Sequence, residues 1–202
     1  VDVDLNPQIV NFIGKAYGSF LIKRKIRQIV AGRDCRLSGL EYEKQFIEGV
    51  LSCGIDVIAL GHVMTQMVYY GQYLFQTNGG VMITASHNPK NFNGFKLAIG
   101  FSQTTGPEEV QEIRKYIENE NFYTSDNKGP LTRADIKENY FKDILKRVQI
   151  KQKFKVIVDS HHGTTSIYNP DLISKTGCEV IEIYTNVDGS FPDGTPDPTD
   201  AK

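Results

Sequence analysis

The sequence of 202 residues contains little cysteine, no tryptophan and almost no net charge. Its three cysteines, Cys35, Cys53 and Cys178, include no Cys-x-x-Cys pair, which argues against a disulfide framework and a cysteine-based zinc site. Basic residues number 23 and acidic residues 24, giving a net charge of −1. This balance provides no general attraction to nucleic acid or to an anionic membrane, so any phosphate-binding site must be local.

Long apolar runs are also missing. No segment approaches the roughly 20 apolar residues that a membrane helix needs, and the chain does not open with a secretory leader. With its reduced cysteines, the protein is expected to be soluble and cytoplasmic, with neither nucleic acid nor membrane as a partner. The chain begins at Val1 and closes on turn-forming residues, PDGTPDPTDAK, so both ends are expected to be cut.

Hydrophobic periodicity predicts helices and strands in alternation. The expected helices lie at 7–20, around 46–51, and at 64–75, 107–117, 133–148 and 167–175, and the expected strands at 26–31, 56–60, 80–84, 94–99, 154–158 and 179–184. The polar segments 32–39 and 121–131 are expected to be loops. Strands alternating with helices imply parallel pairing in an α/β layer architecture. A second α/β unit starts after the helix at 133–148 and is not completed.

Two clusters receive ordinary structural interpretations. The basic run at 23–27 is expected to be a solvated loop beside a strand, and the aromatic residues at 69–75 have near-helical spacing that favours the core. Adjacent His161 and His162 have no further cysteine or histidine partners in the sequence nearby, and they are interpreted as structural or solvent-facing residues, not metal ligands.

One contiguous stretch concentrates reactive side chains: TASHNPKNFNGFK, residues 84–96. Ser86 would follow a buried strand and face the crevice in which open α/β sheets bind ligands. Asn88 precedes a proline and is therefore biased toward extended conformations, which predicts a defined loop. Asn93 and Gly94 predict a tight turn that brings Lys96 back beside Ser86.

A serine hydroxyl is a weak nucleophile that needs a base, a metal or an already positioned electrophile. His87 and Lys96 could supply positive charge to a phosphoryl group, which favours phosphate chemistry. An acyl-transfer hydrolase is disfavoured because the flanking sequence ITASHNP lacks the Gly-x-Ser-x-Gly elbow. In the plain structural alternative, Ser86 only caps a turn, and His87 and Lys96 are surface residues.

The stretch 84–96, preceded by GGVMI, resembles the phosphoserine signature of the α-D-phosphohexomutase family, above all its phosphomannomutase/phosphoglucomutase branch. Four other segments fall in family order: GRDCRLSG at 32–39, VIVDSHHG at 156–163, GCEVIEIY at 177–184 and DGSFPDGTPDPTD at 188–200. Phe95 is closer to this branch than to the phosphoglucosamine mutases. The resemblance covers almost the entire chain.

The resemblance implies a four-domain enzyme whose first three domains share an α/β design with a mixed sheet. Residues 1–132 would form the first domain, and residues 133–202 a linker helix and an incomplete second domain, with the third and fourth domains absent. It further implies that Ser86 carries a phosphoryl group to a hexose monophosphate through a hexose 1,6-bisphosphate. Lys96 would lie at the phosphoserine and help proton transfer, and His87 and Asn88 would line the same pocket.

Mg²⁺ is the cofactor that the resemblance implies, with Ser86 as one ligand. The other ligands would come from an Asp-Gly-Asp type loop that these 202 residues do not contain. Phosphoryl transfer is accelerated mainly by positioning and charge neutralisation, which suits a divalent ion. The family's N-terminal Tyr-Asp-x-Arg-Gly segment is also absent, and His161-His162 replaces a common Asn-Gly pair.

The GRDCR loop leaves two interpretations open. Arg33 or Arg36 could lie near the phosphate, or Asp34 could pair with an arginine to brace the loop. At the level of the whole chain, the leading hypothesis is a phosphohexomutase acting on a hexose phosphate, as a monomer or dimer, with this piece nearly inactive by itself. The competing hypothesis is a noncatalytic sugar-phosphate-binding or regulatory module that retained the serine loop.

Overall fold

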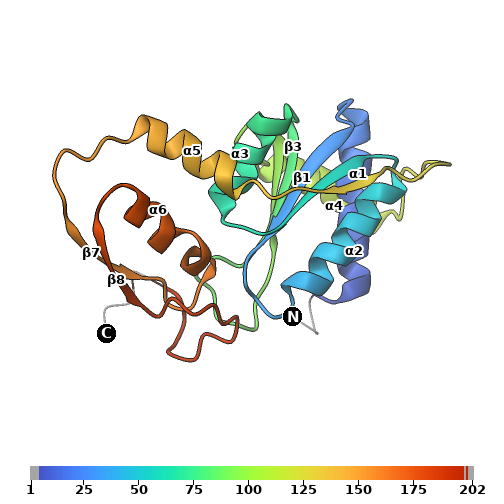
Figure 1. Cartoon of the computed structure of the whole chain (residues 1–202). Helices are drawn as coiled ribbons and strands as arrows, with labels where there is room; N and C mark the ends of the chain where they lie inside the picture. The colour runs from blue at the N-terminus through green and yellow to red at the C-terminus, as the bar shows by residue number, and fades with distance from the viewer. Residues whose placement is uncertain (1–4, 198, 200–202) are drawn as a thin grey trace.

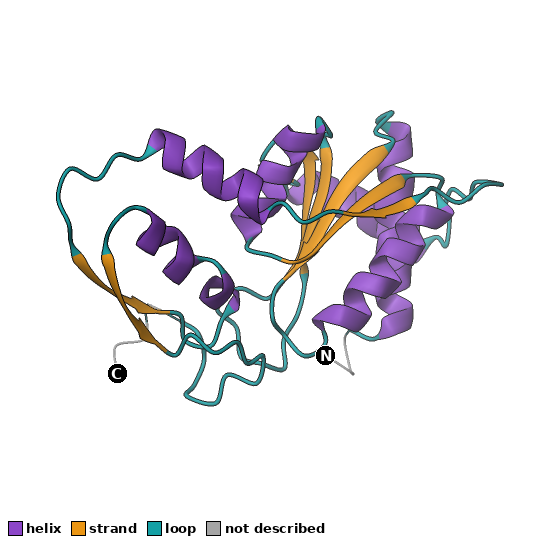
Figure 2. Cartoon of the chain, in the orientation of Figure 1, coloured by secondary structure: helices purple, strands orange, loops and turns teal. Residues whose placement is uncertain are grey.

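The computed structural model of the chain describes residues 5–197 and 199. Its larger part is an α/β unit built on a sheet of six strands (Figures 1 and 2). The strands are β1 (Gln28–Arg33), β2 (Asp56–His62), β3 (Gly79–Ile83), β4 (Phe95–Gly100), β5 (Gln103–Thr104) and β6 (Leu131–Arg133). Their order in the sheet is β5-β4-β3-β1-β2-β6.

The sheet is mixed, as the resemblance implied. The pairs β1-β2, β1-β3 and β2-β6 are parallel, whereas β3-β4 and β4-β5 are antiparallel. The parallel pairing implied by the alternation of strands and helices therefore does not extend to β4. No helix separates β3 from β4, so the chain returns along the neighbouring strand without the crossover that parallel pairing requires.

Helices cover both faces of this sheet. The five helices around it are α1 (Pro7–Lys23), α2 (Gly39–Ser52), α3 (Thr65–Phe75), α4 (Pro107–Glu118) and α5 (Lys137–Arg147). Ile29 and Ala31 of β1 belong to the core shared with α1, α2 and α4, whereas Val30 belongs to the core shared with α3 and α5. Successive side chains of a strand point to opposite faces, which explains this division into two cores.

The first helix shows how local sequence fixes these elements. Asn6 caps α1 with its side chain, whose Oδ1 accepts the Ile9 N–H at 3.0 Å, and a proline occupies the first turn. Further along, α1 and α2 approach closely because glycines face the partner backbone. A Cβ on Gly14 would lie 2.2 Å from the Phe46 carbonyl oxygen, and one on Gly49 would lie 2.3 Å from that of Asn11.

Several boundaries differ from the sequence predictions. Gly32 and Arg33 belong to β1 and not to the following loop, and α5 begins at Lys137 and not at Arg133. Strand β6 replaces the predicted end of a loop, because its backbone pairs with β2 from Val57 to Ala59. All three β6 side chains are exposed, so no hydrophobic alternation could reveal the strand.

The basic run is more ordered than predicted. Lys23 and Arg24, at the end of α1, both pair with Glu112 of α4, with N–O distances of 2.7 and 2.9 Å. The two cations lower the pKa of Glu112 to about 2. The run therefore links two helices and is not simply a solvated loop.

The aromatic run of α3 is only partly in the core. Tyr70 and Phe75 pack against the core shared with α3 and α5, which we call the second core, whereas Tyr73 is 52% exposed. The face of α3 that is fully buried consists of Met67, Val68, Gly71 and Gln72. The prediction of a buried aromatic face is thus wrong for Tyr73, because the smaller side chains on the opposite side of α3 fill the contact with the sheet.

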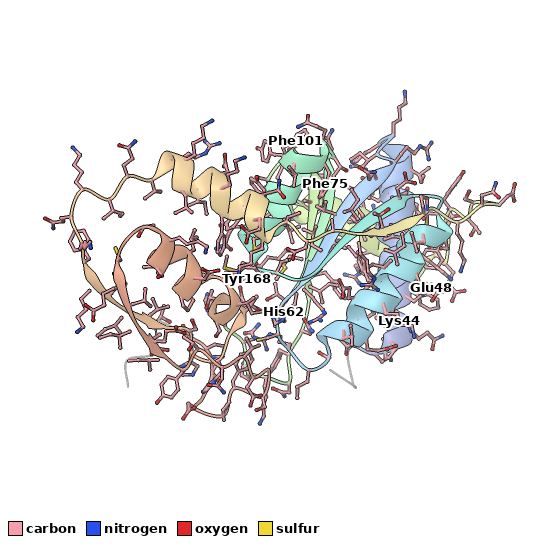
Figure 3. All side chains as sticks on the ribbon, viewed as in Figure 1. Lys44, Glu48, His62, Phe75, Phe101 and Tyr168 are labelled. Atoms are coloured by element: carbon pink, nitrogen blue, oxygen red, sulfur yellow. The ribbon has the colours of Figure 1, made fainter. Side chains whose placement is uncertain are left out.

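A second, smaller unit follows α5. Strands β7 (Lys155–Asp159) and β8 (Glu179–Ile183) pair in parallel, and a 3-10 helix, η1 (Thr164–Ile167), and α6 (Asn169–Lys175) connect them. Tyr168 joins this unit to the first, because its side chain lies in the second core and its hydroxyl donates to the His62 carbonyl at 2.6 Å (Figure 3). His62 Nε2 and Thr164 Oγ1 also lie 3.1 Å apart.

No helix in the described part of the chain is long and apolar enough to cross a membrane.

Candidate active site

The serine-bearing segment is an irregular loop that connects β3 to β4. Two internal turns shape it, in which Asn88 N–H donates to the Ala85 carbonyl and Phe92 N–H to that of Pro89, each at 3.0 Å. The predicted tight turn at 93–94 is wrong, since the reversal is spread over the whole loop and Ile83 pairs with Phe95. The Asn93 side chain instead accepts the Gly94 N–H.

Lys96 returns to the serine, as the sequence predicted. Its Nζ donates to Ser86 Oγ at 3.2 Å. Ser86 itself is exposed and has a φ of 55°, in the left-handed region that few residues other than glycine adopt. Such a conformation persists only where the surroundings impose it, so the loop must hold this serine firmly.

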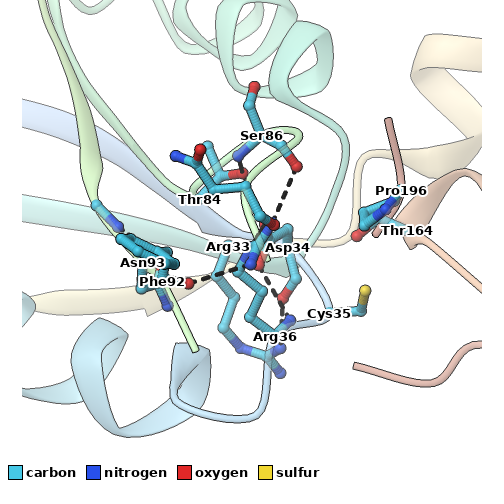
Figure 4. A network of polar contacts seen from close by, with 12 residues as sticks. Arg33, Asp34, Cys35, Arg36, Thr84, Ser86, Phe92, Asn93, Thr164 and Pro196 are labelled. Atoms are coloured by element: carbon cyan, nitrogen blue, oxygen red, sulfur yellow. Dashed lines mark hydrogen bonds and ion pairs between the residues drawn. The ribbon is translucent and has the colours of Figure 1, made fainter. Parts of the chain in front are cut away.

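A chain of polar contacts leads from Ser86 into the protein (Figure 4). Ser86 N–H donates to Thr84 Oγ1 at 2.9 Å, and the Thr84 hydroxyl donates to Asp34 Oδ2 at 2.6 Å. Asp34 lies just after β1, whose parallel neighbour β3 ends at the same edge of the sheet. The backbone of the serine is thereby tied to the adjacent strand end.

Arg36 lies beneath the loop, with a side chain that has no solvent exposure. Its Nε pairs with Asp34 Oδ2 at 3.2 Å, which is the pairing predicted by the bracing interpretation of the GRDCR loop. Its remaining four N–H groups donate to backbone carbonyls of the serine loop, those of Ser86, Asn88, Pro89 and Phe92, at 2.7 to 3.1 Å. All five donors of the guanidinium are therefore directed at protein atoms, which favours bracing over a phosphate contact for this arginine.

Arg33 is also engaged inside the protein. Its Nε donates to Glu43 Oε2 and its Nη1 to the Asp34 carbonyl, both at 3.1 Å. Burial raises the pKa of Glu43, and the Arg33 charge counteracts that shift. A phosphate-binding role for Arg33 or Arg36 stays a prediction.

A pocket of about 610 Å³ opens between the two units, with Ser86 and His87 on its wall. The first unit also contributes Asp34, Cys35 and Thr84, and the second contributes the turn after β7 and the segment 191–197. Asn88 and Lys96 are not among the residues that line this pocket. Lys96 reaches the site through Ser86, and a substrate contact by Asn88 stays a prediction.

Three histidines contact backbone carbonyls of the segment 186–196 in the second unit. His87 Nδ1 lies 3.1 Å from the Pro196 carbonyl oxygen, and His161 Nε2 lies 3.0 Å from that of Gly194. His162 is almost fully buried, with Nδ1 2.9 Å from the Asn186 carbonyl and Nε2 2.6 Å from Asp193 Oδ2. Both ring nitrogens face acceptors, and these contacts raise the pKa of His162. The structural interpretation of the histidine pair agrees with these contacts.

The pocket wall also carries a thiol and the carboxylates of Asp34, Asp159, Asp193 and Asp197. Cys35 lines the pocket, but burial raises the pKa of its thiol, which disfavours the nucleophilic thiolate. Among residues 5–197 and 199, no three histidine, cysteine or acidic side chains lie together so as to hold a metal ion. Ser86, the serine of the predicted motif, stays the candidate nucleophile of this pocket.

Comparison with known proteins identifies the family to which the chain belongs. The model of phosphoglucomutase/phosphomannomutase alpha/beta/alpha domain I matches residues 1–124, and that of domain II matches residues 138–202. The chain belongs to the phosphoglucomutase/phosphomannomutase family. The predicted domain boundary at 132 and 133 falls between the two matched regions and stays a prediction.

Individual relatives agree with this assignment. A phosphomannomutase/phosphoglucomutase of Pseudomonas syringae pv. tomato is 38% identical over 198 residues, which are 98% of this chain and 42% of the relative. A phosphoglucomutase of Neisseria gonorrhoeae is 36% identical over 96% of this chain and 42% of its own length. The crystal structure of a phosphoglucomutase/phosphomannomutase family protein from Burkholderia thailandensis superposes with a TM-score of 0.92 at 28% identity, covering 99% of this chain and 45% of that one. The chain thus spans less than half the length of these relatives.

Sequence reasoning missed two parts of the site. Thr84 was not singled out, although a hydroxyl two residues before Ser86 is the signature of a local side-chain turn. The wall contributed by the second unit was not expected either, because it depends on how segments far apart in the sequence meet.

Proposed function

We propose that this chain is the part of a phosphohexomutase that carries the phosphoryl group. Ser86, as phosphoserine, would transfer its phosphoryl group to a hydroxyl of a hexose monophosphate. The bond between phosphorus and Ser86 Oγ breaks and a bond from phosphorus to the sugar oxygen forms. Ser86 Oγ would take a proton from Lys96, and the proton that the sugar hydroxyl loses would restore the lysine ammonium. The resulting hexose 1,6-bisphosphate turns over and returns its other phosphate to Ser86, which interconverts the 1-phosphate and the 6-phosphate.

The observation that carries this proposal is the placement of Ser86 Oγ at the pocket, 3.2 Å from Lys96 Nζ. As the phosphoryl group leaves, negative charge develops on Ser86 Oγ. A lysine ammonium at hydrogen-bond distance stabilises that charge and can donate a proton to the oxygen, after which the neutral amine can accept the proton that the sugar hydroxyl loses. The interior fixes the backbone of the serine, which restricts the positions that the reacting oxygen can adopt.

Mg²⁺ fits this proposal only in part. The described residues offer Ser86 Oγ as a single ligand, and no cluster of carboxylates accompanies it. The ion usually binds through one or two carboxylates together with phosphate oxygens and water, so further protein ligands would be needed from residues outside this chain. When bound, it would neutralise charge on the phosphoryl oxygens.

His87 is proposed to contact the substrate phosphate from the pocket wall. The hexose specificity, glucose or mannose, would be set mainly elsewhere, because the chain spans about 42% of the relatives' length. A cytoplasmic location and a monomeric or dimeric protein complete the proposal. The 202-residue chain by itself should be nearly inactive.

Steady-state kinetics of the full-length gene product test the proposal. Mutase activity should be abolished in Ser86→Ala and reduced by about 100- to 1,000-fold in Lys96→Met, since a positioned charge of this kind contributes on that order. A Lys128→Met variant serves as the control, because Lys128 pairs with Glu48 on an exposed surface. Normal turnover by Ser86→Ala would contradict the mechanism. A wild-type protein that binds hexose phosphate without turnover would favour the noncatalytic module instead.

A further inference from the structure

Arg36 occupies an unusual position for an arginine, because its side chain is fully buried and only one carboxylate accompanies it. A buried cation is costly unless hydrogen bonds replace the water that it has lost. Asp34 provides one such bond and the charge compensation. The other four acceptors are all backbone carbonyls of a single loop.

The four carbonyls belong to residues spread over seven positions, from Ser86 to Phe92. They do not form a helix or a strand, and no regular backbone pattern would turn them toward one point. Hydrogen bonds from a charged donor are roughly twice as strong as neutral ones. Arg36 therefore holds four carbonyls of the loop together and, with the two internal turns, fixes the shape of the loop.

Ser86 shows this effect most directly. Its carbonyl accepts from Arg36 Nη2 at 3.0 Å, and its N–H donates to Thr84 Oγ1 at 2.9 Å. Both polar backbone groups of the residue are thus held, while φ is 55°. The side-chain oxygen alone remains available to Lys96 and to the pocket.

The second unit covers this arrangement from the other side. The ring of Phe191 lies 5.3 Å from the Arg36 guanidinium carbon, within the range of a cation–π contact. Phe191 is 7% exposed and lines the same pocket as Ser86. Water is therefore kept away from the guanidinium, which strengthens its hydrogen bonds to the loop.

We propose that Arg36 is a positioning residue for phosphoryl transfer: it holds the backbone of the Ser86 loop so that Ser86 Oγ meets the substrate, without itself contacting phosphate. This inference rests on the proposed function of Ser86. A lysine cannot replace Arg36, because an ammonium offers three donors at one point, whereas the guanidinium of Arg36 reaches five acceptors.

The test uses Arg36→Lys in the full-length protein, with Arg114→Lys as the matched control. Arg114 also forms an ion pair, with Glu118, on the exposed face of α4. We expect Arg36→Lys to lower kcat by about 100-fold, the cost of misplacing a reacting atom by about 1 Å. KM for the hexose phosphate should stay unchanged, and Arg114→Lys should match the wild type.

Three other results would contradict the inference or the proposed function, and the kinetic constants distinguish them. A raised KM at unchanged kcat would overturn the inference and make Arg36 a phosphate-binding residue, because uniform binding had then been lost. Wild-type kcat and KM in Arg36→Lys would also overturn it. A wild-type protein without mutase activity and without phosphate on Ser86 would instead overturn the proposed function, and this inference with it.

Asp34→Asn provides a second variant if Arg36→Lys does not fold. It keeps the size of the side chain and removes the charge that orients the guanidinium. We expect a loss in kcat of about tenfold with KM unchanged, since the loop contacts persist but lose their fixed orientation. An Asp34→Asn protein with wild-type kcat would count against the inference.

Discussion

The two units of the chain bury their strands to very different degrees. In the first, β3 is buried along its whole length and β1 over its four central residues. In the second, only Val158 is buried in β7, and none of the β8 side chains is. A parallel sheet normally has both faces covered. The first unit therefore contains its own core within the described residues, whereas the second relies on its contacts with the first and leaves Ile157 63% exposed.

This difference predicts that stability resides mainly in the first unit. Phe46 is fully buried and stacks on Phe95 at a centroid distance of 5.1 Å. Phe46→Ala should lower the free energy of unfolding by about 3–5 kcal/mol, through lost burial and the cavity left behind. Urea titration followed by circular dichroism measures the change.

Ile157→Ala is the matched substitution in the second unit. Because Ile157 is exposed, it should change the free energy of unfolding by about 0.5 kcal/mol or less. Equal losses for the two variants would show that the second unit is as well packed as the first.

The contact between α1 and α2 gives the next largest effect. Gly14→Ala places a methyl group against the Phe46 carbonyl and should cost about 1–3 kcal/mol, since the two helices must move apart. Thermal unfolding measures this loss. Gly163→Ala in the second unit is the comparison, because its new Cβ would lie 3.1 Å from the Ser160 carbonyl oxygen, a tight contact but a longer one than the 2.2 Å at Gly14. A smaller loss for Gly14→Ala than for Gly163→Ala would contradict the close approach of the helices.

The junction between the units should be weaker. Tyr168→Phe removes only the hydroxyl that donates to the His62 carbonyl, and should cost about 0.5–1.5 kcal/mol. Limited proteolysis should then cut the second unit faster while the first stays intact. Tyr123→Phe serves as the control, because that side chain is 47% exposed. Unchanged proteolysis in Tyr168→Phe would show that other contacts hold the junction.

The smallest expected effect is the dependence on pH of the stability that His162 contributes to the second unit. The Asn186 carbonyl, and then the Asp193 carboxylate, raise the pKa of His162 above its ordinary value of 6.5. The charged ring therefore stabilises the fold fully below the unfolded pKa, and this contribution disappears as the pH rises through the raised pKa. The loss of stability in His162→Gln should be larger at about pH 5.5 than at about pH 8.5.

Asp193→Asn tests the cause of that pH dependence, since it removes the carboxylate at 2.6 Å from Nε2. It should weaken the dependence on pH. A loss in His162→Gln that is the same at both pH values would contradict the charged state inferred for this histidine.

Much of the first unit could be predicted from the sequence because its apolar residues follow the periods of buried helices and strands. Local signals added to this: Asn6 before Pro7 predicted the start of α1, and the buried strand before Ser86 predicted that the serine would follow a strand end. Strand β6 could not be predicted, since its side chains are exposed and only its backbone pairs. The burial of Tyr73 was predicted wrongly, because helical spacing does not show which face of α3 packs against the sheet.

The candidate site was predictable to a similar extent. The motif around Ser86 predicted that Lys96 would return to it, and the contact is present. The choice between the two interpretations of the GRDCR loop needed the structure, because the direction of a guanidinium depends on where four distant carbonyls lie. The pocket wall contributed by the second unit needed it too, since the contact of His87 with the Pro196 carbonyl, between the two units, has no local signal.

The central claim is that Ser86 carries the phosphoryl group, and peptide mapping by mass spectrometry tests it most directly. The full-length gene product is incubated with Mg²⁺ and glucose 1,6-bisphosphate beside a Ser86→Ala control. We expect a single phosphoryl group on the peptide that contains Ser86 and none on that peptide in the control. An unlabelled protein, or a label on another residue, would contradict it.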